Sequence, residues 1–122
     1  MKAKLKFLIP LTVLLFIFTK CQDTYFYLIK NETNKDIKVI LVENNPVKND
    51  TLGKFIIGPG VLYEIFRTDD KITWLNPGDS ISFGYQLIIT QDQKLYKNPV
   101  KDSWTPSYDN HYILYVREMD FE

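Results

Sequence analysis

Apolar and polar residues alternate with a period of two along most of the chain after residue 23. Three segments alternate most clearly, and their apolar positions are Ile37, Val39 and Leu41; Ile81, Phe83, Tyr85, Leu87 and Ile89; and Tyr112, Leu114 and Val116. Five weaker segments are Tyr25–Lys30, Lys54–Ile57, Val61–Arg67, Lys71–Leu75 and Lys94–Tyr96. A period of two places neighbouring side chains on opposite faces of a strand, and no segment keeps the 3.6-residue period of a helix. The pattern predicts an all-β domain.

Turn-forming residues separate these segments at intervals of about 8–12 residues. They occur at Asn31–Lys35, Glu43–Asp50, Gly58–Gly60, Asn76–Asp79 and Gln91–Gln93. The later segment Lys97–Asn110 has no clear period and contains two prolines, so we expect a long crossing loop that packs Trp104 against the domain. The sequence therefore predicts one antiparallel β-sandwich, immunoglobulin-like or similar, of about seven to eight short strands.

The first 20 residues have a different pattern. Three lysines near the start precede an apolar run of twelve residues, Phe7–Phe18, and Cys21 follows shortly afterwards as the only cysteine of the chain. A membrane-spanning helix needs about 20 apolar residues, whereas the apolar part of an export signal has about 7–15. We interpret residues 1–20 as a lipoprotein signal peptide and Cys21 as the lipidated first residue of a mature domain, residues 21–122. A conventional cleaved signal, with Cys21 incidental, and an uncleaved membrane anchor are the alternatives.

Removal of the signal changes the charge balance. The signal holds four of the 15 basic residues and none of the 15 acidic ones, which leaves 11 basic and 15 acidic side chains, a net charge of about −4, on the remaining 102 residues. Such a surface repels the phosphates of nucleic acids, so we expect no nucleic-acid partner. The membrane, reached through the lipid on Cys21, is the predicted partner.

Residues that carry catalytic chemistry are few. The chain has a single histidine, His111, and four serines, none of them in a nucleophile elbow. Asp69 and Asp70 are adjacent in a turn-like stretch, where side chains face water, and Asp109 stands apart from them. We expect a protein that is not an enzyme, with no cofactor and no metal site.

Aromatic residues are the remaining candidates for ligand binding. Six of them could form a stacking platform for sugars: Tyr63, Trp74, Tyr85, Tyr96, Trp104 and Tyr108. Core packing explains most aromatic residues in a small β domain. Trp104 and Tyr108 lie in the irregular segment, where binding residues concentrate, and Trp74 is the third candidate.

Two segments and the signal together carry a resemblance to a protein family. Lys30–Ile37 joins the first strand to an Asp-Ile second strand through a polar turn, and Tyr112–Phe121 is an aromatic strand with an acidic-aromatic tail. With a relaxed lipobox, in which Lys20 replaces the usual small residue, these features resemble small lipoproteins of Bacteroidota-type bacteria. The resemblance implies a β-sandwich in the cell envelope and assigns no functional residues.

Three functions follow as hypotheses. The first is a lipid-anchored protein of the bacterial cell envelope, expected at the outer membrane on an undecided face, with a non-catalytic binding or structural role and a protein as the default partner. The second is a carbohydrate-binding module that uses exposed aromatic residues to bind a glycan. The third, a hydrolase, would need two carboxylates about 5–10 Å apart in a cleft.

Overall fold

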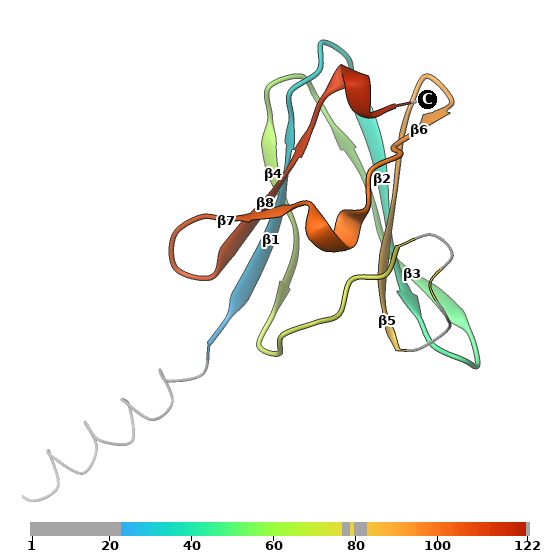
Figure 1. Cartoon of the computed structure of the whole chain (residues 1–122), viewed down its shortest axis with the longest axis vertical. Helices are drawn as coiled ribbons and strands as arrows, with labels where there is room; N and C mark the ends of the chain where they lie inside the picture. Colours follow the sequence, from blue (N-terminus) through green and yellow to red (C-terminus); the bar gives the residue numbers. More distant parts are fainter. Residues whose placement is uncertain (1–22, 77–78, 80–82, 122) are drawn as a thin grey trace, which may run out of the picture.

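Two four-stranded sheets face each other in the computed structural model, which describes residues 23–76, 79 and 83–121 (Figure 1). The strands are β1 (Tyr25–Asn31), β2 (Ile37–Asn44), β3 (Asn49–Ile57), β4 (Leu62–Thr68), β5 (Gly84–Gln91), β6 (Lys94–Leu95), β7 (Trp104–Pro106) and β8 (His111–Val116). Two short 3₁₀ helices are η1 (Val100–Asp102) and η2 (Glu118–Asp120). The predicted all-β sandwich is confirmed.

The first sheet has the order β4-β1-β8-β7, and its central pair is parallel. β1 pairs antiparallel with β4 on one side and parallel with β8 on the other. Antiparallel neighbours can be joined by a short hairpin, but β1 and β8 are the first and last strands, so their connection is the whole intervening chain. Every other pair of strands among the described residues is antiparallel.

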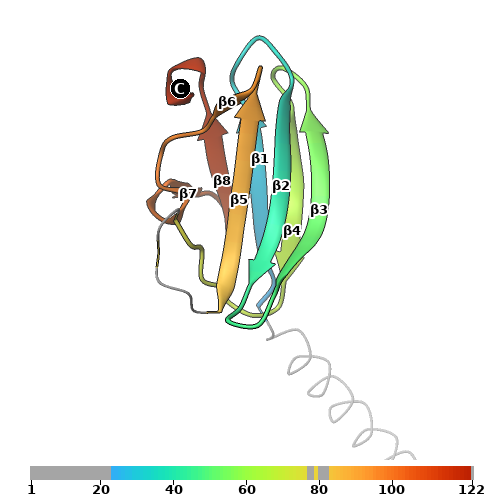
Figure 2. The same ribbon diagram turned by 90° about the vertical axis from the view of Figure 1, so that its right-hand side faces the viewer.

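The second sheet has the order β3-β2-β5-β6, and all its pairs are antiparallel (Figure 2). β5 and β6 form the hairpin predicted at Gln91–Gln93: Gln91 pairs with Lys94, and Asp92 and Gln93 between them have φ values of 49° and 66°. Two successive positive φ values are typical of a type I′ turn, whose twist suits a two-residue hairpin. This prediction is confirmed.

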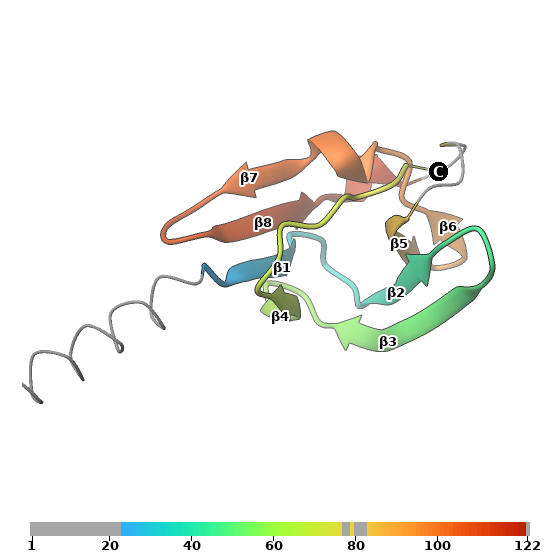
Figure 3. The same cartoon turned by 90° about the horizontal axis from the view of Figure 1, so that it is seen from below.

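The connection from β3 to β4 is the predicted break at Gly58-Pro59-Gly60. The Val61 N–H donates to the Gly58 carbonyl at 3.2 Å, and Gly60 has a φ of 74°. A positive φ at the third residue of a turn favours glycine. The turn carries the chain from one sheet to the other, as Figure 3 shows from below.

The core lies between the inner faces of the two sheets. The predicted inward positions of β2 are buried, and so are Leu114 and Val116 of β8. The side chains that are at most 2% exposed are Ile29, Asn31, Ile37, Val39, Leu41, Ile57, Ile89, Leu114 and Val116. Burial of one such aliphatic side chain contributes about 1.5–3 kcal/mol relative to exposure. On the longest predicted face, Ile89 is buried, Phe83 is 59% exposed and Ile81 lies outside the described residues.

Three secondary-structure predictions from the sequence were wrong. The predicted loop Lys97–Asn110 contains η1 and the edge strand β7, which is too short to show a period and ends at a proline that an edge strand tolerates. The predicted strand Lys71–Leu75 is irregular apart from one bridge between Trp74 and Tyr85. β3 begins at Asn49, five residues before its predicted start.

The polar turn after β1 contains a buried hydrogen-bond network. Asn31 is 0% exposed; its amide group donates to the carbonyls of Lys35 at 2.7 Å and Ile57 at 2.9 Å, and its carbonyl oxygen accepts from the Thr33 N–H at 2.9 Å. The Gln91 side-chain amide in turn donates to the Thr33 hydroxyl at 2.7 Å. Since Ile57 and Gln91 belong to the second sheet, this network joins the two sheets at this end of the sandwich.

Candidate functional site

A hollow of about 330 Å³ lies beside the aromatic end of the core and brings together two of the predicted binding residues. It is lined by Tyr27, Lys71, Ile72, Thr73, Trp74, Lys101, Trp104 and Tyr112. Five segments supply these residues: β1, η1, β7, β8 and the crossing segment, residues 69–76, which runs from β4 toward β5 (Figure 1). We call this site the aromatic hollow.

Tyr27 is the centre of the ring cluster in the aromatic hollow. Its ring centroid lies 5.2 Å from Trp74 and 5.2 Å from Trp104, with interplanar angles of 75° and 72°. It stacks on Tyr112 at 5.5 Å, and the two tryptophan rings lie 4.9 Å apart. Edge-to-face and offset pairs are the favoured geometries of aromatic rings, each contributing about 0.5–1.5 kcal/mol beyond burial. The walls of the hollow are therefore held in fixed relative positions.

Both indole N–H groups of the cluster lack hydrogen-bond partners within the described part of the chain. The nitrogens of Trp74 and Trp104 are enclosed, and Trp74 as a whole is 6% exposed. A buried donor without a partner costs about 1–3 kcal/mol. Two such donors beside one hollow distinguish this region from the rest of the core.

The Tyr27 hydroxyl lies in the same environment. Burial raises its pKa, and the nearby Tyr112 adds to the rise. The neighbouring Trp74 indole and the Ile72 backbone oppose the rise, although the Trp74 N–H does not reach Tyr27 with the geometry of a hydrogen bond. The hydroxyl thus stays protonated at neutral pH and is able to donate.

Two cations stand at the rim of the aromatic hollow. Lys71 comes from the crossing segment and Lys101 from η1, and both are exposed. Neither forms an ion pair with any residue that the structure describes. No acidic side chain lines the hollow, so these ammonium groups dominate its local electrostatics.

The predicted binding residues therefore separate into two groups. Trp104 is half-buried in the wall of the aromatic hollow, and Trp74 is so enclosed that a ligand could reach only part of its ring. Tyr108 lies elsewhere: it is 72% exposed and stacks on His111 at 4.5 Å. Cys21 lies outside the described residues.

Tyr108 belongs to a ladder of stacked groups on the outer face of the first sheet. His111 stacks on Phe26 at 4.3 Å with an interplanar angle of 12°, and the Arg67 guanidinium lies 4.8 Å from the centre of the Phe26 ring. Each inner ring covers the face of its neighbour, so only the outer face of Tyr108 remains open. This ladder does not present a flat surface of several rings.

The carboxylates that the sequence placed in turns are exposed to solvent, as expected for turn residues. Asp69 and Asp70 are exposed, with Asp69 accepting a hydrogen bond from the Thr24 hydroxyl at 3.1 Å, and Asp109 is exposed in the turn before β8. The sequence did not predict the buried Asp120, which accepts from the Asn98 amide at 2.6 Å and from the Arg117 N–H at 2.9 Å. No group of three potential metal ligands occurs among the described residues.

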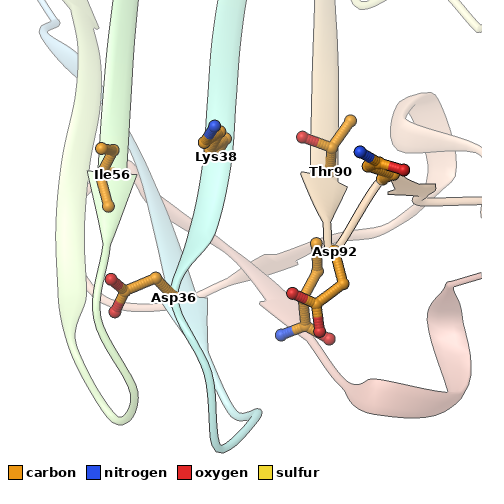
Figure 4. A pocket seen from close by; sticks show the side chains of 7 residues that line it. Asp36, Lys38, Ile56, Thr90 and Asp92 are labelled. Carbon is orange, nitrogen blue, oxygen red and sulfur yellow. The ribbon is translucent and has the colours of Figure 1, made fainter.

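A larger hollow of about 610 Å³ lies on the outer face of the second sheet (Figure 4). Ile56, Lys38 and Thr90 form one cross-strand row there. Asp36 and Asp92 lie at its end, and Asp92 pairs with Lys35 at 2.7 Å, which lowers the pKa of the carboxyl group and raises that of the amine. No aromatic ring lines this hollow, so it lacks a surface on which a ring could stack.

The same sheet face carries an aliphatic strip, which consists of Ile40, Ile56, Ile88 and Leu95. Ile40 pairs with Ile88 across β2 and β5, and Ile56 and Leu95 occupy the neighbouring row. Ile56 is 68% exposed and Leu95 is 51% exposed. Adjacent exposed aliphatic side chains are a common feature of protein-contact surfaces.

Sequence reasoning named Trp74 and Trp104 as binding residues and missed the other six residues that line the aromatic hollow. Alternation placed Tyr112 on the same face as Leu114 and Val116, and it could have placed Tyr27 inward with Ile29, but neither tyrosine was assigned to a site. Lys71 and Lys101 are 30 residues apart in irregular segments, and no pattern links them. Only the three-dimensional fold brings them to one hollow.

Comparisons with protein-family models, with curated proteins and with solved structures give no match to this chain. Among the residues that the structure describes, no helix has the length and apolar character to cross a bilayer.

Proposed function

We propose that this protein is a non-catalytic binding domain of the bacterial cell envelope, anchored by lipid on Cys21, and that the aromatic hollow binds a sugar ring. The observation that carries this proposal is the pair of tryptophans in one wall, both with unpaired indole N–H groups. Buried polar groups are almost always partnered, and exceptions concentrate at functional sites.

The lining of the aromatic hollow suits a sugar chemically. A pyranose ring has an apolar face of C–H groups, which packs on an aromatic ring such as Trp104, and an edge of hydroxyl groups. The hydroxyls of Tyr27, Thr73 and Tyr112 can donate to or accept from that edge. The volume of about 330 Å³ lies at the lower end of the usual range for ligand pockets, which suits one or two sugar units.

The lipid anchor rests on the export pattern of residues 1–20 and the position of Cys21. Because β1 begins at Tyr25, three residues would separate the lipidated cysteine from the domain, a reach of about 10 Å at full extension. The domain would then lie close to the membrane surface.

The anchor is tested by expressing the full chain in a bacterium supplied with an alkyne fatty acid. We expect label in the protein and none in Cys21→Ser, together with loss of Cys21→Ser from the membrane fraction. Equal labelling of both chains, or an unlabelled wild-type chain, would refute lipidation at Cys21.

Sugar binding is tested separately, on a glycan array probed with the detergent-solubilised full chain. We expect retention on a defined set of glycans and loss of that retention in Trp104→Leu, with Tyr108→Leu as the control outside the hollow. Absence of all retention would count against the proposed ligand class.

The aliphatic strip supports a second candidate function, attachment of an envelope protein to the outer face of the second sheet. A photoreactive residue at Ile56 should then cross-link one defined protein in intact cells. Ile88→Glu should abolish the cross-link, because a charge in the centre of the strip would have to be desolvated. Cross-linking that is unchanged by Ile88→Glu would exclude the strip as the contact surface.

A further inference from the structure

We infer that the aromatic hollow selects an acidic sugar, a hexuronic acid residue, over its neutral counterpart. The inference rests on the proposed function and adds the chemical class of the ligand. It is carried by Lys71 and Lys101, two cations from separate elements that border one hollow. Selection would come from the carboxylate that replaces the hydroxymethyl group of a neutral hexose.

The charge around the aromatic hollow differs from that around the other surface hollows. The large outer-face hollow has two carboxylates, Asp36 and Asp92, against one lysine, and a hollow of about 270 Å³ nearby has two carboxylates against two lysines. A further hollow of about 180 Å³ has no charged residue in its lining. The aromatic hollow has two lysines and no carboxylate in its lining, although Asp70 and Asp102 are the sequence neighbours of those lysines. In a mature domain with a net charge of about −4, the lining of this hollow therefore has a local excess of positive charge.

The two lysines are also free to bind. Lys35, Lys48, Arg67 and Arg117 each pair with a carboxylate, but neither Lys71 nor Lys101 does so within the described residues. An unpaired ammonium on a flexible stem can donate charge-assisted hydrogen bonds to a carboxylate. Since such ligand carboxyl groups ionise well below pH 7, the ligand would be an anion under physiological conditions.

The two parts of the site would recognise different parts of the ligand. The half-buried Trp104 would contact the apolar face of the sugar ring, which acidic and neutral sugars share. Lys71 and Lys101 would contact the carboxylate, which only the acidic sugar has. Substitution of the tryptophan should therefore weaken binding of both sugars, and substitution of the lysines should weaken binding of the acidic sugar alone.

Tryptophan fluorescence measures this directly, because Trp74 and Trp104 are the only tryptophans of the chain and both line the hollow. The full-length lipoprotein in detergent micelles is titrated with the trimer of galacturonic acid and, separately, with the matched neutral trimer of galactose. We expect about tenfold tighter binding of the acidic trimer, an advantage that shrinks as salt screens the lysines.

Lys71→Gln and Lys101→Gln should each reduce the affinity for the acidic trimer about threefold, as exposed charge pairs do, and leave the affinity for the neutral trimer unchanged. Lys54→Gln is the matched control, because it removes the same charge from an exposed position on β3 of the other sheet. It should leave both affinities unchanged.

The failures of the two proposals can be distinguished. Equal affinity for the two trimers, or an acidic preference that persists in the double variant of Lys71 and Lys101, would overturn the inference while sugar binding in the hollow stands. No saturable fluorescence change with either trimer would overturn both. A preference lost equally in Lys54→Gln would show a general charge effect and would also overturn the inference.

Discussion

The two ends of strand β1 bury polar atoms in opposite ways. At its C-terminal end, Asn31 is fully enclosed and its side chain bonds three backbone groups, two through its amide hydrogens and one through its oxygen. Near its N-terminal end, Tyr27 packs against two tryptophans whose indole N–H groups have no partner among the described residues.

The difference between paired and unpaired buried groups indicates which end of β1 stabilises the fold. A buried network with all its groups paired stabilises the fold and specifies one arrangement of the sheets. Buried donors without partners lower stability, and a protein retains them where they serve another purpose. The Asn31 end thus holds the two sheets together, and the unpaired donors at the Tyr27 end are the reason for proposing a binding site there.

The largest expected effect follows from Asn31→Ala. This substitution removes the side chain that bonds the Ile57 carbonyl and the Thr33 N–H, and it leaves the Lys35 carbonyl with the Thr33 hydroxyl as its remaining close donor. We expect a loss of about 3 kcal/mol in the free energy of unfolding. Urea unfolding of the full chain in detergent micelles measures it. Asn34→Ala, at an exposed position of the same turn, should change stability by less than about 0.5 kcal/mol. Similar losses of unfolding free energy in Asn31→Ala and Asn34→Ala would contradict the stabilising role of the Asn31 network.

At the other end of β1, Trp74→Phe should change stability much less. The smaller ring leaves a gap, but the substitution also removes an unpaired buried donor, so we expect a net change of less than about 1 kcal/mol. The same urea titration applies, followed by circular dichroism because one fluorophore is lost. A loss of about 3 kcal/mol or more would mean that the indole N–H is part of a stabilising network.

The buried tyrosines give a smaller, pH-dependent effect. Burial raises the pKa of Tyr27 and of Tyr96, so the unfolded chain releases these protons at lower pH than the folded chain does. Their contribution to stability is fully present below pH 10, the usual tyrosine value, and is lost as the pH rises through the raised folded-state values. Thermal unfolding between pH 8 and 11 should show this decline, and Tyr27→Phe should make it less steep. A profile that Tyr27→Phe leaves unchanged would contradict the burial of this hydroxyl.

The smallest effect concerns the ion pair between Lys35 and Asp92, which joins the β1–β2 turn to the β5–β6 hairpin. The amine lowers the pKa of the Asp92 carboxyl group, so the pair stabilises the fold above the ordinary carboxyl pKa, and this contribution is lost as the pH falls through the lowered value. Both side chains are more than 60% exposed, so Asp92→Asn should be indistinguishable from wild type in urea unfolding at physiological salt. A clear loss there would show that this end depends on charge as well as on the Asn31 network.

The sequence predicted the regular parts of this molecule well. Alternation at Ile37–Leu41 identified a core strand, and Gln91–Gln93 was recognised as a hairpin because a two-residue turn has a local signature. Asn31 was assigned to a polar turn, because nothing local indicates that its amide will be enclosed between two sheets. Trp74 and Trp104 were named as binding residues, but Lys71 and Lys101 were not, since only the packing of the crossing segment against η1 brings them together.

One nuclear magnetic resonance titration tests the binding role of the Tyr27 end of β1, because the chain has two tryptophans and both line the aromatic hollow. The ¹⁵N-labelled full chain in detergent micelles is titrated with the trimer of galacturonic acid. We predict that both indole N–H signals shift saturably while the Asn31 side-chain amide signals stay in place. Indole signals that do not move, or an Asn31 amide that moves as much as they do, would contradict the assignment of binding to the Tyr27 end of β1.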